Sequence, residues 1–185
     1  MIIGITGTDG AGKGSAVAYL VANKGYAYFS AREFILERIT AQGLSTDRNQ
    51  MRLTANALRA EYGDDFLVRR AYEAIDSAGT KQAVIESIRA IAEANLLKAR
   101  GAILLAIDAP VLLRYERVQA RRSESDQVTF EQFVAHEELE KNDPDPHGMQ
   151  KAAVMEMADY TIINDGTLEE LHRKLEEFLA KFHSA

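Results

Sequence analysis

A glycine-rich stretch close to the N-terminus carries the clearest chemical signal in the sequence. Residues 7–15 read GTDGAGKGS, with an apolar run before them and a segment of helical period after them. Glycines here let successive backbone N–H groups turn towards an anion, the following helix adds the positive end of its dipole, and Lys13 adds an ammonium. The spacing predicts a triphosphate site rather than a turn that is rich in glycine only for packing. Its expected contacts are Asp9, Gly10, Ala11, Gly12, Lys13, Gly14 and Ser15.

Two positions in this stretch need separate interpretation. The hydroxyl that usually follows the lysine and contacts Mg²⁺ arrives one residue late, because Gly14 precedes Ser15. Ser15 is therefore the candidate metal contact. The carboxylate of Asp9 would face the space between a phosphate donor and an acceptor, where it could orient the acceptor or a metal-bound water. The alternative is that Asp9 caps a nearby backbone N–H.

A second charged pair follows the apolar run at residues 83–86. Glu86 ends this run and Arg89 stands three residues later, in the stretch AVIESIR. In open α/β sheets, ligands bind beyond the carboxyl ends of the strands, so both side chains would share an edge with the glycine loop. Glu86 could hold a magnesium-bound water or an acceptor hydroxyl, and Arg89 could bind an acceptor phosphate. The alternative is an ordinary helix N-terminus with an exposed acid and base.

A third group of charges lies on the predicted helix after Pro110. Arg114, Arg117 and Arg121 fall within about 60° of one another around such a helix. Positioned arginines stabilise the charge that spreads over a phosphoryl group during its transfer. This helix and the short polar stretch at about 121–128 resemble the lid of nucleotide kinases, and the resemblance implies that Arg117 and Arg121 act in this way. For Arg114 and Arg122, a solvated helix face remains the alternative.

The composition excludes several functional classes. The chain has 185 residues, no cysteine and a net charge of −6, with a pI near 5.3. A thiol nucleophile is impossible, and a general nucleic-acid surface is not expected. No apolar run approaches the ~20 residues of a membrane helix, and the N-terminus does not read as a signal peptide. We expect no membrane partner and a cytoplasmic location. The four histidines share no metal-binding spacing, and we assign them no role.

Short apolar runs alternate with longer segments of helical period, which favours an α/β fold with a parallel sheet. The expected strands are residues 2–6, 27–29, 83–86, 102–108 and 160–164. The expected helices are 13–24, about 31–42, 47–61, 64–77 and 88–99, one after Pro110, one behind Thr129 as N-cap, and one at the C-terminus. Residues 31–78 are too long for one crossover and predict a helical insert. We expect one domain over residues 1–185.

Several of these motifs resemble known kinases. A lysine followed by Gly14 and then a hydroxyl is similar to nucleoside monophosphate kinases, and DGAGK looks like the thymidylate kinase loop. Glu86-Ser87-Ile88-Arg89 resembles the Asp-Gly-x-Pro-Arg stretch of adenylate kinases. The arginine helix and ADYTIINDGTLEEL resemble dephospho-CoA kinase. The resemblance implies a three-layer α/β/α P-loop kinase fold with a five-stranded parallel sheet, a helical acceptor-binding insert and a short lid.

The same resemblance extends to the acceptor and to the adenine. FSAREFILER stands where adenylate kinases have Ser-Thr-Gly-Asp-x-x-Arg, so Ser30 and Glu33 match the serine and the acid, but Leu36 replaces the arginine. Arg32 or Arg38 would have to substitute for it. Near the C-terminus, Asn164 and Gly166 would lie beside the donor adenine. The acceptor-binding candidates are Ser30, Arg32, Glu33, Arg38, Arg59, Glu86 and Arg89.

The sequence thus predicts phosphoryl transfer from ATP, with Mg²⁺, to a phosphate-bearing small molecule, first of all a nucleoside or deoxynucleoside monophosphate. Lys13, Arg117 and Arg121 would stabilise the transfer, and Ser15 and Glu86 would contact the metal, the latter through water. One alternative is transfer to a hydroxyl, as in dephospho-CoA kinase, with Asp9 as general base. Another is a nucleotide-dependent switch or assembly factor with weak ATPase activity. The partners would be small-molecule nucleotides, and the protein would be a monomer or homodimer.

Overall fold

Five short strands form one parallel sheet in the computed structural model, which describes residues 1–121 and 128–183. Their spatial order is β2-β3-β1-β4-β5, and every neighbouring pair is parallel. The strands are β1 (Ile2–Gly7), β2 (Ala27–Ser30), β3 (Ala83–Glu86), β4 (Ile103–Asp108) and β5 (Tyr160–Ile163). The five predicted strands are confirmed, and their ends differ from the prediction by at most one residue.

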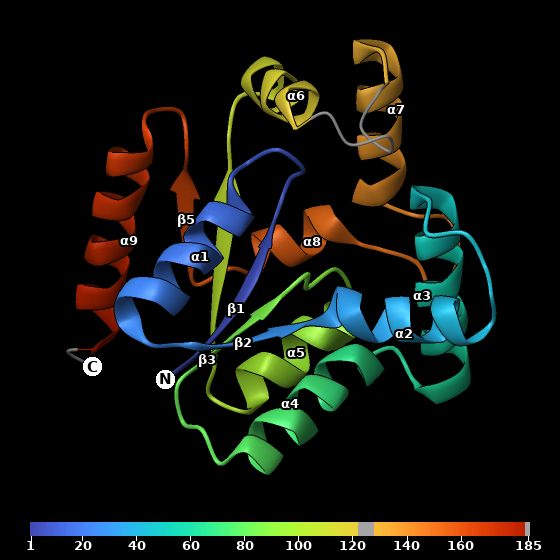
Figure 1. The fold of residues 1–185 in the computed structure, drawn as a ribbon, viewed down its shortest axis with the longest axis horizontal. Helices are drawn as coiled ribbons and strands as arrows, with labels where there is room; N and C mark the ends of the chain where they lie inside the picture. Colours follow the sequence, from blue (N-terminus) through green and yellow to red (C-terminus); the bar gives the residue numbers. More distant parts are fainter. Residues whose placement is uncertain (122–127, 184–185) are drawn as a thin grey trace.

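Alternate residues of the strands supply two separate cores on opposite faces of the sheet. Val84 and Leu105 belong to one core, whereas their neighbours Ile85 and Leu104 belong to the other. This period of two explains why the strands read as continuous apolar runs, since both of their faces are buried. One core includes α1 (Lys13–Lys24) and α9 (Leu168–His183), and the other includes α4 (Phe66–Ala78), α5 (Ile91–Ala99) and α8 (Lys151–Glu156). The three-layer α/β/α fold is confirmed (Figure 1).

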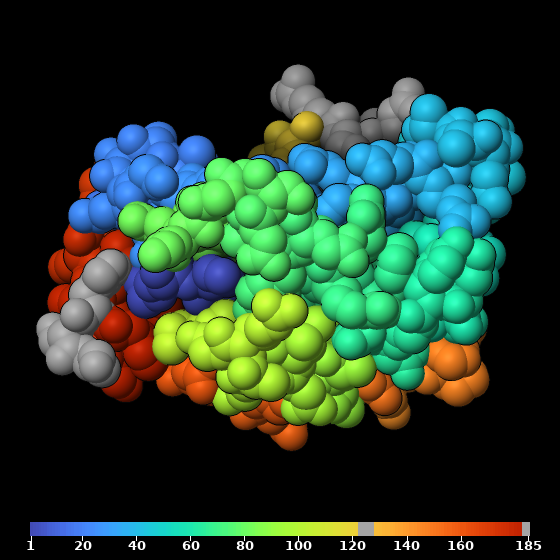
Figure 2. Space-filling view, turned by 90° about the horizontal axis from the view of Figure 1, so that it is seen from below, coloured from blue at the N-terminus to red at the C-terminus, as the bar shows by residue number. Residues whose placement is uncertain are grey.

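The helical insert has a small core of its own. It contains α2 (Ala31–Ala41) and α3 (Arg48–Tyr62), which pack on each other and on the first turn of α4. The carboxylate of Asp47 caps α3 by accepting a hydrogen bond of 2.9 Å from the backbone N–H of Gln50. The rest of α4 packs on the sheet. The lobe formed by α2 and α3 lies at the end of the molecule opposite α9, as the colours of Figure 2 show.

The described residues between β4 and β5 form three helices, whereas the pattern predicts two. These are α6 (Val111–Ala120), α7 (Phe130–Lys141) and the short α8. Thr129 and Gln132 form the predicted capping box at the start of α7. The sequence pattern missed α8, which has only two turns behind the DPDPHG turn. Most of the predicted lid at 121–128, including Arg122, lies outside the described residues.

The helix that was expected over residues 88–99 begins later, at Ile91. Glu93 explains the difference, because its carboxylate accepts hydrogen bonds from the backbone N–H groups of Arg89 and Ala90, at 2.8 and 3.0 Å. These bonds cap the helix and leave residues 87–90 as a turn at the carboxyl end of β3. No helix within the described residues is long and apolar enough to cross a membrane.

Candidate active site

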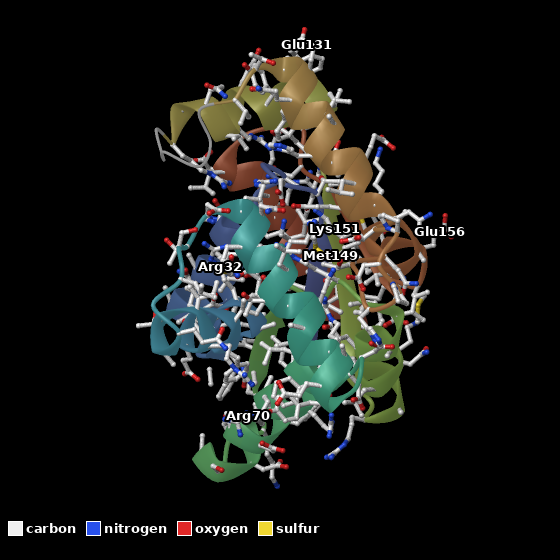
Figure 3. The ribbon with its side chains drawn as sticks, turned by 90° about the vertical axis from the view of Figure 1, so that its right-hand side faces the viewer. Arg32, Arg70, Glu131, Met149, Lys151 and Glu156 are labelled. Atoms are coloured by element: carbon white, nitrogen blue, oxygen red, sulfur yellow. The ribbon has the colours of Figure 1, made fainter. Side chains whose placement is uncertain are left out.

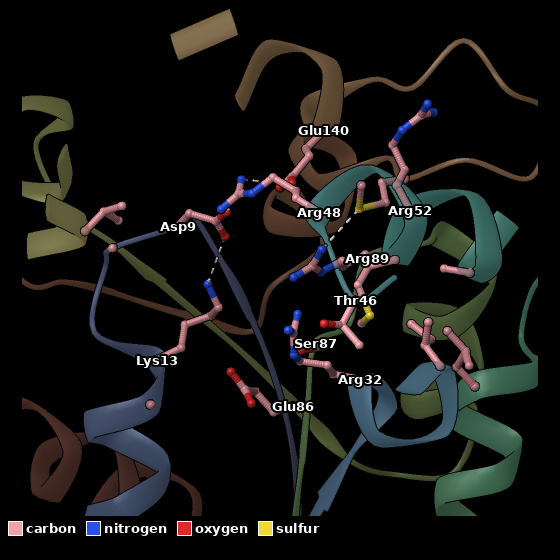
Figure 4. A pocket seen from close by; sticks show the side chains of 18 of the residues that line it. Asp9, Lys13, Arg32, Thr46, Arg48, Arg52, Glu86, Ser87, Arg89 and Glu140 are labelled. Carbon is pink, nitrogen blue, oxygen red and sulfur yellow. Dashed lines mark hydrogen bonds and ion pairs between the residues drawn. The ribbon is translucent and has the colours of Figure 1, made fainter. Parts of the chain in front are cut away.

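One cavity of about 600 Å³ opens between the glycine-rich loop of residues 7–15, called the phosphate loop below, the carboxyl end of β3 and the insert (Figure 4). Among the described residues, seven cationic side chains and three acidic ones line it, although the whole chain is acidic. Concentrating positive charge in one hollow favours an anionic ligand there. The cations are Lys13, Arg32, Arg48, Arg52, Arg59, Arg89 and Arg121, and the acids are Asp9, Glu86 and Glu140.

The phosphate loop needs its glycines because other parts of the chain pass very close to it. Gly10 and Gly12 have φ angles of 79° and 99°, in the region that favours glycine. A Cβ on Gly10 would lie 2.4 Å from the backbone oxygen of Arg114, and one on Gly12 would lie 2.3 Å from the amide nitrogen of Asn164. The loop is therefore held in shape by α6 and by the turn after β5.

Lys13 is half-buried beside the loop that it follows, with 13% of its side chain exposed. Its Nζ donates hydrogen bonds to the backbone oxygens of Gly7 and Thr8, at 3.1 and 2.8 Å, and lies 3.8 Å from a carboxylate oxygen of Asp9. Burial lowers the pKa of Lys13 to about 8, even though Asp9 acts in the opposite direction. If a phosphate bound at this point, the ammonium of Lys13 could leave these two neutral carbonyl oxygens and pair with the charged phosphate instead.

Asp9 points into the cavity and contacts three cations from different parts of the chain. Its carboxylate lies 2.8 Å from Arg48, 3.5 Å from Lys151 and 3.8 Å from Lys13. Burial alone would raise the pKa of Asp9, but Lys151, Lys13 and Arg48 together hold it well below the ordinary value. Among the described residues, the carboxylate accepts no hydrogen bond from a backbone N–H. The described residues thus give no support to the capping role that was one alternative for Asp9.

Glu140 of α7 completes this ion network, and sequence reasoning missed all of its members except Asp9 and Lys13. Glu140 lies 2.7 Å from Lys151 and 3.2 Å from Arg48. The side chain of Lys151 is only 3% exposed, and Figure 3 shows Lys151 beside Met149 in the middle of the molecule, near α3. No motif contains Arg48, Glu140 or Lys151. Only the packing of α3, α7 and α8 brings them to the loop.

The carboxyl end of β3 brings Glu86, Ser87 and Arg89 to the cavity wall. Glu86 accepts a hydrogen bond of 2.9 Å from the hydroxyl of Tyr28. The guanidinium of Arg89 lies 3.3 Å from the sulfur of Met149, and its backbone oxygen accepts a bond from Gln150. Both predicted residues, Glu86 and Arg89, therefore lie beside the phosphate loop.

The arginines of the cavity differ in whether a carboxylate already pairs with them. Arg59 is 1% exposed and lies 2.9 Å from Glu93, and Arg52 lies 2.9 Å from Asp143. In contrast, neither Arg32 nor Arg89 forms an ion pair with any carboxylate in the described part of the chain. The charge of Arg59 is therefore satisfied within the protein, whereas those of Arg32 and Arg89 face the cavity.

Three of the predicted acceptor residues do not line this cavity. Arg38 bonds to Glu61 and Tyr62 on the outer side of the insert, at 3.3 and 3.1 Å. Ser30 is buried at the start of α2, and Glu33 is exposed on the same helix. Of the two arginines that could substitute for the one expected at Leu36, only Arg32 reaches the cavity.

The two arginines of α6 and Arg121, which directly follows it, have three different environments. Arg121 lines the cavity. Arg117 instead donates hydrogen bonds to the backbone oxygens of Asn164 and Gly166, at 2.9 and 3.3 Å. Arg114 is buried in a double contact with Glu137, so the solvated face that was an alternative for it is wrong.

Asn164 and Gly166 lie behind the phosphate loop, where they were expected to flank an adenine. The side-chain amide of Asn164 donates a hydrogen bond of 2.7 Å to the backbone oxygen of Ala11. Together with the contacts of Arg117, this bond ties the turn after β5 to α6 and to the loop. Neither residue lines the cavity itself.

Sequence reasoning also missed an acid at the end of β4. Asp108 accepts hydrogen bonds from the hydroxyl of Thr8, at 2.5 Å, and from the backbone N–H of Ala109, at 2.8 Å. Its position at the end of the buried run AILLAID was the available signal.

In the part of the chain that the structure describes, no group of three acidic or histidine side chains could hold a metal. A Mg²⁺ ion here would depend mainly on phosphate oxygens and water, with the exposed Ser15 hydroxyl beside them.

Comparisons with known proteins agree with this architecture. No protein-family model matches the chain. It is 29% identical over 183 residues to a UPF0200 protein of Staphylothermus marinus, covering 97% of this chain and 92% of that one. A UPF0200 protein of Methanothermobacter thermautotrophicus is 26% identical over 183 residues, with coverages of 98% and 90%.

Solved structures share the fold at lower identity. TT1252 from Thermus thermophilus has a TM-score of 0.63 and 24% identity, with coverages of 98% of this chain and 97% of that one. A shikimate kinase from Acinetobacter baumannii in complex with shikimate has a TM-score of 0.55 and 20% identity, with coverages of 97% and 93%. A sugar kinase from Janibacter has a TM-score of 0.53 and 14% identity, with coverages of 97% and 94%. The chain has the fold of P-loop kinases.

Proposed function

We propose that this protein is a small-molecule kinase that transfers the terminal phosphoryl group of ATP to a phosphate-bearing acceptor, namely a nucleoside or deoxynucleoside monophosphate. One observation carries the proposal. A single cavity contains both the phosphate loop with Lys13 and two arginines, Arg32 and Arg89, that no described carboxylate neutralises. Two anionic groups could be held there at the same time and brought together for transfer.

On the donor side, the loop amides and Lys13 would bind the phosphates of ATP. Asn164 and Gly166 would lie beside the adenine, with Arg117 holding their turn in place. Arg121 would reach the phosphoryl group from the end of α6. Bound Mg²⁺ would neutralise charge on the phosphates; Ser15 would contact it directly and Glu86 through water.

On the acceptor side, the cavity combines cations with an apolar wall. That wall is formed by Ile35, Met51, Ala55, Leu67 and Met149. A nucleoside monophosphate matches this arrangement, because its base can pack against apolar side chains while its phosphate meets guanidinium groups. The transfer would then depend on positioning and charge stabilisation rather than on a nucleophilic side chain.

The environment of Asp9 favours a phosphate acceptor over a hydroxyl acceptor. A phosphate monoester is largely ionised at pH 7, because its second pKa is about 6. Its oxygen can attack without losing a proton to the protein. A hydroxyl acceptor, as in the dephospho-CoA kinase alternative, needs a general base, and three surrounding cations make Asp9 a weak base by lowering its pKa.

An acceptor panel tests the proposal. Purified protein with MgATP would be mixed with ribo- and deoxynucleoside monophosphates, dephospho-CoA, shikimate and a hexose, and ADP formation would be measured. We expect at least one monophosphate to accelerate ADP formation strongly. If only a hydroxyl acceptor accelerated ADP formation, the acceptor would be a hydroxyl compound and not a monophosphate. If no compound accelerated it, the slow ATPase switch would be favoured instead.

A further inference from the structure

Ser87 has an unfavourable backbone conformation at the wall of the cavity. Its φ angle is +74°, in the left-handed region, and it is the only residue other than glycine in that region among those described. An L-residue is strained there because its Cβ crowds the neighbouring carbonyl oxygen, whereas glycine is not. Strain of this kind persists only where the surroundings impose it, and it is frequent at ligand sites.

The surroundings of Ser87 do impose the conformation. The next residue, Ile88, is fixed on both sides: its N–H bonds to the backbone oxygen of Ile5 at 3.2 Å, and its oxygen accepts the Thr6 hydroxyl at 2.9 Å. Glu93 then holds the two following N–H groups. The turn is therefore determined by β1 and α5, whatever side chain residue 87 carries.

The hydroxyl of Ser87 has no hydrogen-bond partner among the described residues. No hydrogen bond joins it to any residue that the structure describes, yet Ser87 is half-buried and lines the cavity. In the sequence it lies between Glu86 and Arg89, which also line the cavity. Figure 4 shows Arg32 near it on the cavity wall. Glycine would make the same turn without strain.

We propose that Ser87 is a specificity-determining residue of the acceptor subsite. Its hydroxyl donates a hydrogen bond to an oxygen of the anionic group that Arg32 and Arg89 bind. The two guanidinium groups supply the charge, and the hydroxyl selects an oxygen-rich, tetrahedral anion such as a phosphate monoester. This inference rests on the proposed function for the identity of the acceptor, but the subsite itself is defined by the three side chains.

Two substitutions separate the hydroxyl from the strain. Ser87→Gly removes both, and Ser87→Ala removes the hydroxyl while keeping a Cβ. With the best acceptor of the panel, we expect both variants to raise the acceptor KM about tenfold, since a hydrogen bond to a charged group is lost. The KM for ATP stays unchanged. Ser87→Gly should also raise the melting temperature by about 2–4 °C, whereas Ser87→Ala should not.

A matched control is Ser77→Ala, which removes an exposed serine hydroxyl on α4 that donates a hydrogen bond to the backbone oxygen of Glu73. It should leave both KM values unchanged. If Ser87→Gly raised the melting temperature but left the acceptor KM as it was, Ser87 would be a turn residue and the inference would be wrong. A parallel rise in the KM for ATP would point to general distortion of the site and would also overturn it.

A binding measurement keeps this test independent of the proposed function. Inorganic phosphate would be titrated into the protein while a non-hydrolysable ATP analogue with Mg²⁺ saturates the phosphate loop, and the heat of binding would be recorded. Binding that weakens about tenfold in Ser87→Ala supports the subsite even if no acceptor in the panel is phosphorylated. Equal binding by the wild type and Ser87→Ala, or none by the wild type, overturns the subsite even if the protein proves to be a kinase.

Discussion

The two ends of the cavity are built in different ways. At the phosphate-loop end, one continuous stretch supplies the backbone N–H groups and Lys13, and that lysine is already bonded to the loop itself. At the acceptor end, Arg32 comes from α2 and Arg89 from the turn after β3, and neither pairs with a described carboxylate. Under the proposed function, the loop end would recognise phosphate through local geometry, whereas the acceptor end would depend on charges that pair with no described carboxylate.

The ion network around Asp9 lies at the junction of the two ends. Through Arg48 it connects the loop to the insert, and through Lys151 and Glu140 it connects the loop to α8 and α7. A ligand that moves the insert would therefore change the electrostatic surroundings of the loop. The predictions below test whether the two ends contribute separately.

The largest effect is expected at the loop end. Lys13→Ala should lower kcat by at least about 100-fold, because the ammonium that stabilises charge on the terminal phosphates is lost. Steady-state ADP formation measures it. Lys24→Ala, on the same helix but paired with Glu176, is the matched control and should keep wild-type turnover. Wild-type turnover by Lys13→Ala would contradict both the kinase and the ATPase interpretations.

At the acceptor end, two neighbouring arginines should behave in opposite ways. Arg89→Ala should raise the acceptor KM about 10- to 100-fold with little change in unfolding free energy, because its guanidinium faces the cavity. Arg59→Ala should instead lower the unfolding free energy by about 3–5 kcal/mol, because it leaves the buried Glu93 carboxylate unpaired. Kinetics and urea unfolding separate the two. Similar losses of stability in both variants would remove the distinction between paired and unpaired arginines.

The contribution of Asp9, at the junction of the two ends, to the free energy of unfolding should depend on pH. The pKa of Asp9 is lower in the folded protein than in the unfolded chain, so its contribution to stability is present above the unfolded value near 4 and is lost as pH falls through the folded value. We expect Asp9→Asn to cost about 1–3 kcal/mol at pH 7 and progressively less towards pH 3. Urea unfolding at several pH values measures this. Asp76→Asn, at an exposed position of α4, is the control and should leave the unfolding free energy at pH 7 unchanged.

The smallest effect concerns the charge of Lys13. Its pKa of about 8 means that the ammonium loses its proton as pH rises past that value, and with it the attraction for phosphate. The KM for ATP should therefore rise roughly tenfold between pH 7 and pH 9. Lys13→Arg should remove this dependence, because arginine keeps its charge. A flat profile for the wild type would show that the loop amides alone hold ATP in this range.

Much of the fold could be read from the sequence, because both faces of the parallel strands are buried. That burial produces continuous apolar runs, and each predicted run became a strand within one residue of its expected ends. The short helix α8 was missed, since two turns give too little periodicity to detect. The start of α5 was misplaced, because the capping carboxylate of Glu93 lies inside the apolar pattern.

The residues of the candidate site likewise fall into those that the sequence pattern places and those that only packing places. The sequence by itself determined the phosphate loop and the position of Glu86 and Arg89, because consecutive residues and strand ends place these groups without any knowledge of distant contacts. Only the tertiary structure decided which other charges meet them. Arg38 and Arg59 look like Arg32 in the sequence, but one lies outside the cavity and the other is neutralised by Glu93. Arg48 and Lys151 carry no motif, and they reach Asp9 because α3 and α8 pack beside the loop. The role of a charged side chain on a helix cannot be read from the sequence, because packing determines whether a carboxylate, solvent or a ligand site faces it.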